Sequence, residues 1–155
     1  MDKLKFTDIQ ETTKLYKYLN SLPITHVMLV CGHSFYMIFI TWLLYDPFLA
    51  LIIYVTPLPF KRLFRRDRPV YPGTLSRKRF GWDKWGMPSG HALMFAGATM
   101  QLYTTIGIYS AVFIPVALTG SFERVRKGAH FISDVLVGWI IGIVIVLLYD
   151  YVFIS

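Results

Sequence analysis

The stretch that decides the fold runs from His130 to Phe153 and reads HFISDVLVGWIIGIVIVLLYDYVF. A bilayer core takes about 20 consecutive apolar residues of α-helix, and this stretch supplies them with Asp134 as its only charge before the last turn. It therefore predicts a membrane helix. Gly138 and Gly142 are four residues apart and share one face of that helix, so they predict close packing against a neighbouring helix.

The rest of the chain has the same apolar character. Of its 155 residues, 55% are hydrophobic, which is more than the core of a soluble domain of that length needs. The sequence predicts one all-α domain over residues 1–155, a polytopic transmembrane bundle of about five helices. The predicted membrane helices are Ile24–Tyr45, Phe48–Phe60, Ser89–Thr105, Ile108–Phe122 and His130–Phe153.

Prolines, glycines and charges set the boundaries between these helices. Pro57 and Pro59 break the second helix, which is short. Gly107 lies in an apolar stretch too long for one span, so we divide that stretch into two helices; one long kinked helix is the alternative. Residues 61–87 are polar and predict a loop that carries part of the candidate site. Residues 1–20 mix lysines with acidic residues and predict an interfacial segment, not a secretory leader.

The chain carries a formal net charge of +7, with 16 lysines and arginines. These cations alternate with membrane-length apolar runs, which predicts anionic lipid and no nucleic acid as the partner. If the helices alternate in direction, every lysine and arginine falls on one side of the membrane. The three cations of the candidate site would lie with the site in either orientation, but the bias remains when they are not counted. The positive-inside rule then predicts that the active-site face is cytoplasmic.

Two motifs flank the polar loop. Lys61 and Arg68 are seven residues apart, so if the second helix continues through them they lie two turns apart on one face, separated by about 10 Å. Such a pair either binds a phosphate or anchors lipid headgroups. Ser89, Gly90 and His91 follow Pro88 directly before an apolar run, as at a helix N-terminus.

A helix N-terminus binds anions through its free backbone N–H groups. Gly90 would let the backbone approach a phosphate, Ser89 offers a hydroxyl, and His91 can donate a proton to a leaving oxygen. A capped helix with an interfacial histidine is the alternative.

The third motif places Arg124 six residues before His130, with Asp134 four residues later. On a helix, His130 and Asp134 would share one face, and the carboxylate could hold the distal N–H of the imidazole. The other ring nitrogen could then attack phosphorus while Arg124 neutralises the phosphate oxygens. An aspartate in an apolar helix is costly, which favours a functional role over a structural one. His26 and His33 have no such partner and are interpreted as packing or interface residues.

Together these three motifs resemble the signature of the type 2 phosphatidic acid phosphatase (PAP2) superfamily, which also includes vanadium haloperoxidases. The resemblance covers Lys61 to about Gly142. It implies an all-helical bundle and hydrolysis of a phosphomonoester or diphosphate without a metal or other cofactor. It further implies His130 as nucleophile, His91 as general acid and Asp134 as the orienting partner. The implied phosphate ligands are Lys61, Arg68, Ser89, Gly90 and Arg124.

Two features depart from the family pattern. The serine expected before Arg124 is Glu123 here, which places a negative charge near the phosphate unless it pairs with Arg126 or Lys127. The chain is also one helix short of six-span members, which raises homo-oligomerisation as a way to complete the bundle. Family relatives commonly place their sites on the outer or lumenal face, against the charge count above.

The sequence thus predicts an integral-membrane lipid phosphatase that acts on phosphatidate or a polyprenyl diphosphate through a phosphohistidine on His130. The acyl or prenyl tails would stay in the bilayer while the headgroup reaches the site. A catalytically weak lipid-phosphate-binding protein is the alternative, and Glu123 is its main support. A haloperoxidase-like use of the site with vanadate is disfavoured because those members are soluble.

Overall fold

The structure is a computed structural model and describes residues 45–69 and 84–154. Every regular element within these residues is helical, in agreement with the predicted all-α class. The predicted interfacial segment and the first predicted membrane helix lie outside the described residues, apart from Tyr45. The elements in chain order are α3 (Pro47–Val55), α4 (Pro57–Phe64), α5 (Gly90–Ile106), the 3-10 helix η2 (Gly107–Phe113), α6 (Ile114–Arg126) and α7 (Ile132–Phe153).

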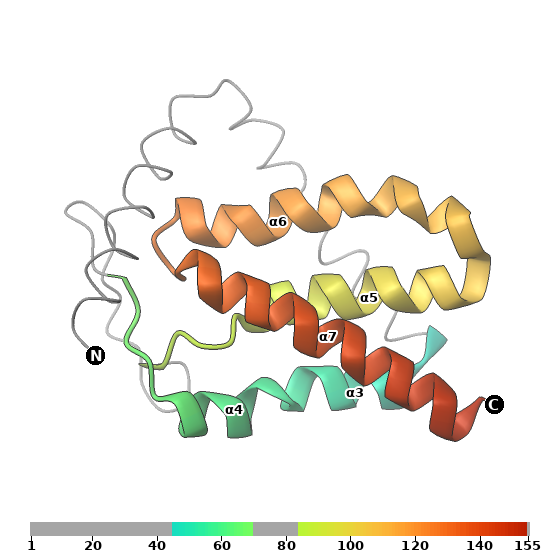
Figure 1. Cartoon of the computed structure of the whole chain (residues 1–155), viewed down its shortest axis with the longest axis horizontal. Coiled ribbons are helices and arrows are strands. Elements are labelled where there is room, and N and C mark those ends of the chain that lie inside the picture. The colour runs from blue at the N-terminus through green and yellow to red at the C-terminus, as the bar shows by residue number, and fades with distance from the viewer. Residues whose placement is uncertain (1–44, 70–83, 155) are drawn as a thin grey trace.

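The helices run back and forth along one axis (Figure 1). Helices α3 and α4 follow one another, α5 and α6 lie antiparallel, and α7 packs against α3, α5 and α6. As a result the C-terminal ends of α4 and α6 and the N-terminal ends of α5 and α7 all lie at one end of the bundle, on the left of the view. The η2 turn and the C-terminus of the chain lie at the other end.

Three helical stretches are long and apolar enough to cross a membrane: Pro47–Phe64, Gly90–Arg126 and Ile132–Phe153. The second has 37 residues and folds back on itself at η2, as the predicted division at Gly107 requires. Gly107 has a φ of +64°, a conformation that costs a residue with a Cβ atom free energy. Large apolar side chains such as Leu136 and Ile140 point outward along α7, as lipid contact demands.

Among the described helices, α5 and α7 are in the closest contact, and glycines of α7 allow this close approach. A Cβ atom on Gly138 would lie 2.7 Å from the carbonyl oxygen of Ser89, and one on Gly142 would overlap the carbonyl oxygen of Leu93. The predicted role of this glycine pair in helix packing is therefore confirmed. The contact fixes the start of α5, with Ser89, against the first turns of α7.

Several helix ends differ from the prediction. Helix α4 extends to Phe64 and ends at Arg65, which takes a left-handed φ of +45°. Lys61 is thus on a helix and Arg68 lies beyond its end, so the two-turn spacing expected for this pair is wrong. Helix α6 starts later than predicted, at Ile114, because η2 takes up the preceding residues, and it continues to Arg126.

Candidate active site

The site lies at the end of the bundle where four helix ends meet, and His130 is at its centre. The side chain of His130 is 2% exposed. The residue is in the turn between α6 and α7, not on α7 as predicted, since Phe131 is the N-cap of α7. The backbone N–H groups of Ala129 and His130 both donate to the carbonyl oxygen of Arg124, at 3.0 and 3.3 Å. The last turn of α6 therefore fixes the backbone of this histidine.

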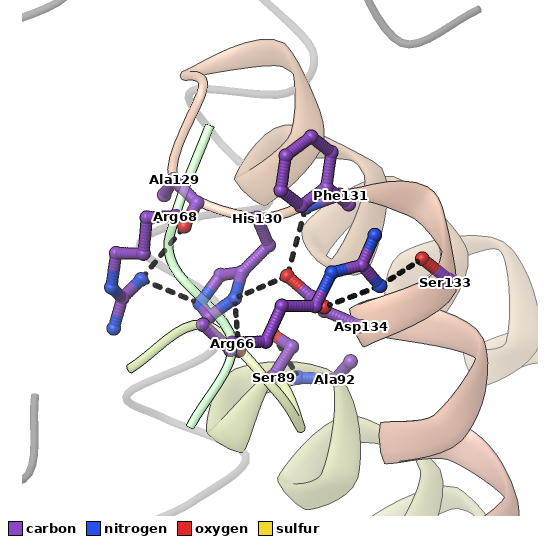
Figure 2. Close-up of polar contacts among 10 residues, drawn as sticks. Arg66, Arg68, Ser89, Ala92, Ala129, His130, Phe131, Ser133 and Asp134 are labelled. Atoms are coloured by element: carbon purple, nitrogen blue, oxygen red, sulfur yellow. Dashed lines mark hydrogen bonds and ion pairs between the residues drawn. The ribbon is translucent and has the colours of Figure 1, made fainter. Parts of the chain in front are cut away.

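Two neighbours determine which ring nitrogen of His130 carries the proton (Figure 2). Nδ1 lies 2.8 Å from the carbonyl oxygen of Gly86, and Nε2 lies 3.0 Å from Nη1 of Arg68. A carbonyl oxygen can only accept a hydrogen bond and a guanidinium can only donate one. Nδ1 must therefore hold the proton, and the lone pair of Nε2 faces the arginine.

His130 is also held neutral. Its pKa is well below the ordinary value, first because burial disfavours the charged imidazolium, and then because Arg68, Arg124 and Lys61 add positive charge nearby. The hydrogen bond to Gly86 opposes this shift only in part. A neutral imidazole with a directed lone pair is the form that acts as a nucleophile.

Asp134 lies on the Nδ1 side of the ring. Its Oδ2 accepts the backbone N–H of Phe131 at 2.9 Å, which caps α7, and lies 3.6 Å from Nδ1 of His130. Its Oδ1 lies 3.3 Å from Nη1 of Arg66. The predicted orienting role of Asp134 stays a prediction: the acceptor at hydrogen-bond distance from Nδ1 is Gly86, and the carboxylate is the second acceptor on that side.

The three predicted phosphate-binding cations come together on His130 from three segments. Lys61 is in the last turn of α4 and is buried, and Arg124 is in the last turn of α6. Arg68 follows α4 and donates from Nη1 to the carbonyl oxygen of Ala129 at 2.7 Å. All three act electrostatically on His130. This concentration of positive charge around one nucleophilic nitrogen is suited to a phosphate dianion.

The predicted helix start at Ser89 completes the arrangement. Ser89 is the N-cap of α5, and its hydroxyl accepts the backbone N–H of Ala92 at 3.4 Å. Its own N–H donates to the carbonyl oxygen of Asp134 at 2.9 Å, which joins α5 to α7. Gly90 and His91 are in the first turn of α5, and the side chain of His91 is half-buried. Their predicted contacts with phosphate and leaving group stay predictions.

Comparisons with known proteins agree with this geometry. The family model of the PAP2 superfamily matches residues 42–153. The chain belongs to the PAP2 superfamily. A search of curated proteins finds no match.

The fold matches the crystal structure of a transmembrane PAP2 type phosphatidylglycerolphosphate phosphatase from Bacillus subtilis. The TM-score is 0.63 and the sequence identity 19%, over 99% of this chain and 89% of that one. The chain is thus an integral membrane protein with a PAP2 phosphatase fold, as the motifs predict.

Glu123, which stands where a serine is expected in PAP2 proteins, pairs with two cations at the C-terminal end of its own helix. Its carboxylate accepts hydrogen bonds from Nε and Nη2 of Arg126 at 2.6 and 2.7 Å, and Nζ of Lys127 lies 3.0 Å away. The glutamate side chain is 7% exposed. Its negative charge is therefore balanced by two cations that the candidate phosphate site does not use.

Two residues of this PAP2 site were missed from the sequence. The sequence motifs single out neither Arg66 nor Gly86. Arg66 reaches across to α7, and Gly86 contacts both Arg66 and His130. A Cβ atom on Gly86 would lie 3.0 Å from Oδ2 of Asp134, so a side chain at this position would force a neighbouring group to shift. The signal available in the sequence was a glycine two residues before Pro88, at the start of the helix-start motif.

Proposed function

We propose that the protein is a membrane phosphatase that removes a phosphate from a lipid headgroup through a covalent phosphohistidine on His130. The observation that carries the proposal is the fixed tautomer and orientation of this imidazole. Its Nδ1 proton is held by Gly86 while the Nε2 lone pair faces Arg68, among three cations that belong to the PAP2 signature. Nucleophile and charge stabilisation are thus in place before the substrate binds.

The reaction has two steps. In the first, the Nε2 lone pair of His130 forms a bond to phosphorus while the bond from phosphorus to the leaving oxygen breaks, and His91 gives its proton to that oxygen. In the second, water attacks phosphorus, the P–N bond breaks, and His91 takes the proton from the water. Inorganic phosphate leaves and both histidines return to their starting states.

Arg68 has two roles in this scheme. In the resting site its Nη1 donates to Nε2 of His130 at 3.0 Å, the same nitrogen that must attack. A bound phosphate offers the guanidinium stronger acceptors, because its oxygens carry negative charge and can accept two parallel N–H bonds, whereas the neutral imidazole offers one uncharged lone pair. Substrate binding would therefore draw Arg68 onto the phosphate oxygens and release the lone pair for attack.

The location of the site favours a lipid as substrate. The cations lie at one end of an apolar bundle, where a headgroup can reach them while its tails remain in the bilayer. Phosphatidate and polyprenyl diphosphates are the substrates suggested by the motifs, and the structural relative adds phosphatidylglycerolphosphate. Every lysine and arginine in the described residues is at this end of the bundle, which supports a cytoplasmic site. Thiol labelling in sealed vesicles tests that orientation.

Phosphate release from these three lipids in detergent and EDTA tests the proposal. We expect the native protein to hydrolyse at least one of them, and acid quench with a ³²P-labelled substrate to trap a phosphoprotein. His130→Ala should abolish both signals. Tyr149→Phe, which removes only a 3.4 Å contact to Asp46 far from the site, should retain them. Full activity in His130→Ala would refute the mechanism.

A lipid-phosphate-binding protein with little turnover is the second candidate, because Glu123 takes away a hydroxyl that could bind phosphate. The pairing of Glu123 with Arg126 and Lys127 weakens that case, since the carboxylate does not oppose the substrate's charge. Saturable binding of a lipid phosphate without release of inorganic phosphate would identify the binder.

A further inference from the structure

Helix α4 ends at the site (Figure 1), and two of its phenylalanines are close in the chain to the signature lysine, Lys61. The rings of Phe60 and Phe64 stack, with their centroids 6.2 Å apart and their planes 15° from parallel. Phe60 is half-buried and Phe64 is 44% exposed. The two rings therefore form one apolar surface that is partly open to the surroundings.

The direction of each side chain follows from the helix. Successive residues of an α-helix are turned by about 100°, so Phe60 and Phe64 lie about 100° and 60° to one side of Lys61. Lys61 faces the bundle, because it is buried and acts electrostatically on His130. Leu63 is turned about 160° from Lys61 and faces away from the site. The phenylalanine pair therefore borders the site, whereas Leu63, in the same turn as Phe64, does not.

Within the described residues, α4 is the one helix end at the site that exposes large apolar side chains. In its last turn, Leu63 is 73% exposed and Phe64 is 44% exposed. The last turn of α6 is rich in charge, and no large apolar side chain is exposed in that turn or in the first turns of α5 and α7. A lipid tail that leaves the phosphate site therefore finds its exposed apolar contact at α4.

The two flanks of Lys61 differ in polarity. Phe64 is on one flank, and Arg62, an exposed arginine turned about 100° the other way, is on the opposite flank. Side chains three residues apart on a helix are neighbours, with Cβ atoms about 5–6 Å apart. A lipid whose phosphate contacts Lys61 can therefore place the first carbons of its tail on Phe64 while its polar side faces Arg62.

We propose that Phe60 and Phe64 bind the part of the substrate's acyl or prenyl tail nearest the headgroup, and so make the site selective for phosphates attached to a lipid. This inference rests on the proposed function above, because it places the tail of that substrate. The phenylalanines contact the tail and leave the phosphate itself to the signature cations. Anchoring of α4 in the bulk bilayer is the competing role, and the two roles predict different results.

The first test compares Phe64→Ala, Phe64→Leu and Leu63→Ala in the full-length chain. Two quantities are measured in mixed micelles: the KM of the lipid phosphate, among the three above, that the native protein hydrolyses fastest, and the inhibition constant of inorganic phosphate, which has no tail. We expect Phe64→Ala to raise the KM about 5- to 10-fold, because a half-exposed aromatic side chain loses its contact with the tail. The inhibition constant of phosphate should change less than about twofold.

Leu63→Ala is the matched control, since it removes a more exposed apolar side chain from the same turn of α4. It should match the native protein, and Phe64→Leu, which keeps an apolar side chain, should raise the KM less than about threefold. A misfolded fraction lowers kcat and leaves KM unchanged, so it cannot imitate the expected result. The proposal is overturned if Phe64→Ala keeps the native KM, if phosphate inhibition weakens by the same factor, or if Leu63→Ala raises the KM as much.

A crosslinking measurement keeps this proposal separate from the proposed function. Each of the three lipid phosphates, made with a diazirine on the tail carbon nearest the headgroup, serves as a probe of the native protein. We expect light to attach at least one probe at Phe60 or Phe64, and the unmodified lipid phosphate, but not phosphatidylcholine, to prevent this labelling. Equal displacement by phosphatidylcholine would show bulk-lipid contact and reject the tail site. If the native protein hydrolyses none of the three lipids, the proposed function fails, whereas hydrolysis without labelling of α4 rejects the tail site alone.

Discussion

Replacing Gly86 by alanine should reduce catalysis without reducing stability. The added Cβ atom would lie 3.0 Å from Oδ2 of Asp134, 3.4 Å from Cγ of Arg68 and 3.5 Å from the carbonyl oxygen of Arg66. Ordinary C···O contacts begin at about 3.3–3.4 Å, so one side must move by about 0.3–0.4 Å. The buried carboxylate is fixed by Phe131 and Arg66, so the loop at Gly86 should yield.

The size of the effect follows from that displacement. The 2.8 Å contact from Gly86 to Nδ1 of His130 would lengthen toward about 3.2 Å, the limit of a good hydrogen bond. Since a misplacement of 1 Å can cost about 100-fold in rate, a shift of about 0.3–0.4 Å should lower kcat about 4- to 6-fold. Gly86 does not have a positive φ, so alanine should leave the melting temperature unchanged or slightly higher.

Gly107→Ala supplies the opposite control. Gly107 is at the far end of the bundle, where a Cβ atom would meet nothing within 4 Å, but its φ of +64° strains an alanine by about 1–3 kcal/mol. It should lose stability and keep the native kcat per folded molecule. Steady-state kinetics and thermal unfolding of both variants in one detergent provide the assay. The reasoning is refuted if Gly86→Ala keeps the native kcat, or if its activity falls only as far as its folded fraction.

Three further predictions follow from single contacts. Because the pKa of His130 is lowered in the folded protein, only the unfolded chain takes up a proton as pH drops below about 6.5, so stability should fall by up to about 1.4 kcal/mol per pH unit. Melting temperatures between pH 8 and 5 should fall less in His130→Gln, and parallel curves would contradict this. Glu123→Gln should lower the free energy of unfolding, measured by chemical denaturation, by about 1–2 kcal/mol, because Arg126 loses a bidentate carboxylate partner. An unchanged free energy would show that this ion pair makes no net contribution to stability. Gly142→Ala should lower the free energy of unfolding by about 1–3 kcal/mol, because the added Cβ atom would overlap the carbonyl oxygen of Leu93 and push α7 away from α5. An unchanged melting temperature would contradict this.

The sequence predicts the helices well because their signals are local. Apolar length identifies the stretch from His130 to Phe153 as a membrane helix, and the spacing of Gly138 and Gly142 identifies its packed face. The reversal at Gly107 is also predicted, since a single span cannot hold a largely apolar helical stretch of 37 residues and glycine permits the turn. In each case the deciding information lies within one helix or at its end.

The details of the site depend instead on contacts between distant parts of the chain. The left-handed conformation of Arg65 ends α4 before Arg66 and turns the chain so that Arg66 reaches Asp134, 68 residues away. The pairing of His130 with Gly86 spans 44 residues. Periodicity describes neighbours on one helix and cannot predict such pairs. It also placed His130 and Asp134 on one helical face, although their contact comes from the cap of α7.

Helix direction explains why the signature charges can be buried together. Lys61 and Arg124 are in the last turns of α4 and α6, where the partial negative charge of the helix dipole favours cations. Asp134 is in the first turn of α7, where the dipole favours an anion, and the free N–H groups at the start of α5 would favour a phosphate. Each match contributes about 0.3–1 kcal/mol. Because neighbouring helices alternate in direction, one end of the bundle presents both N-terminal and C-terminal helix ends. The cations can therefore lie at C-terminal ends, and the carboxylate and the substrate phosphate at N-terminal ends.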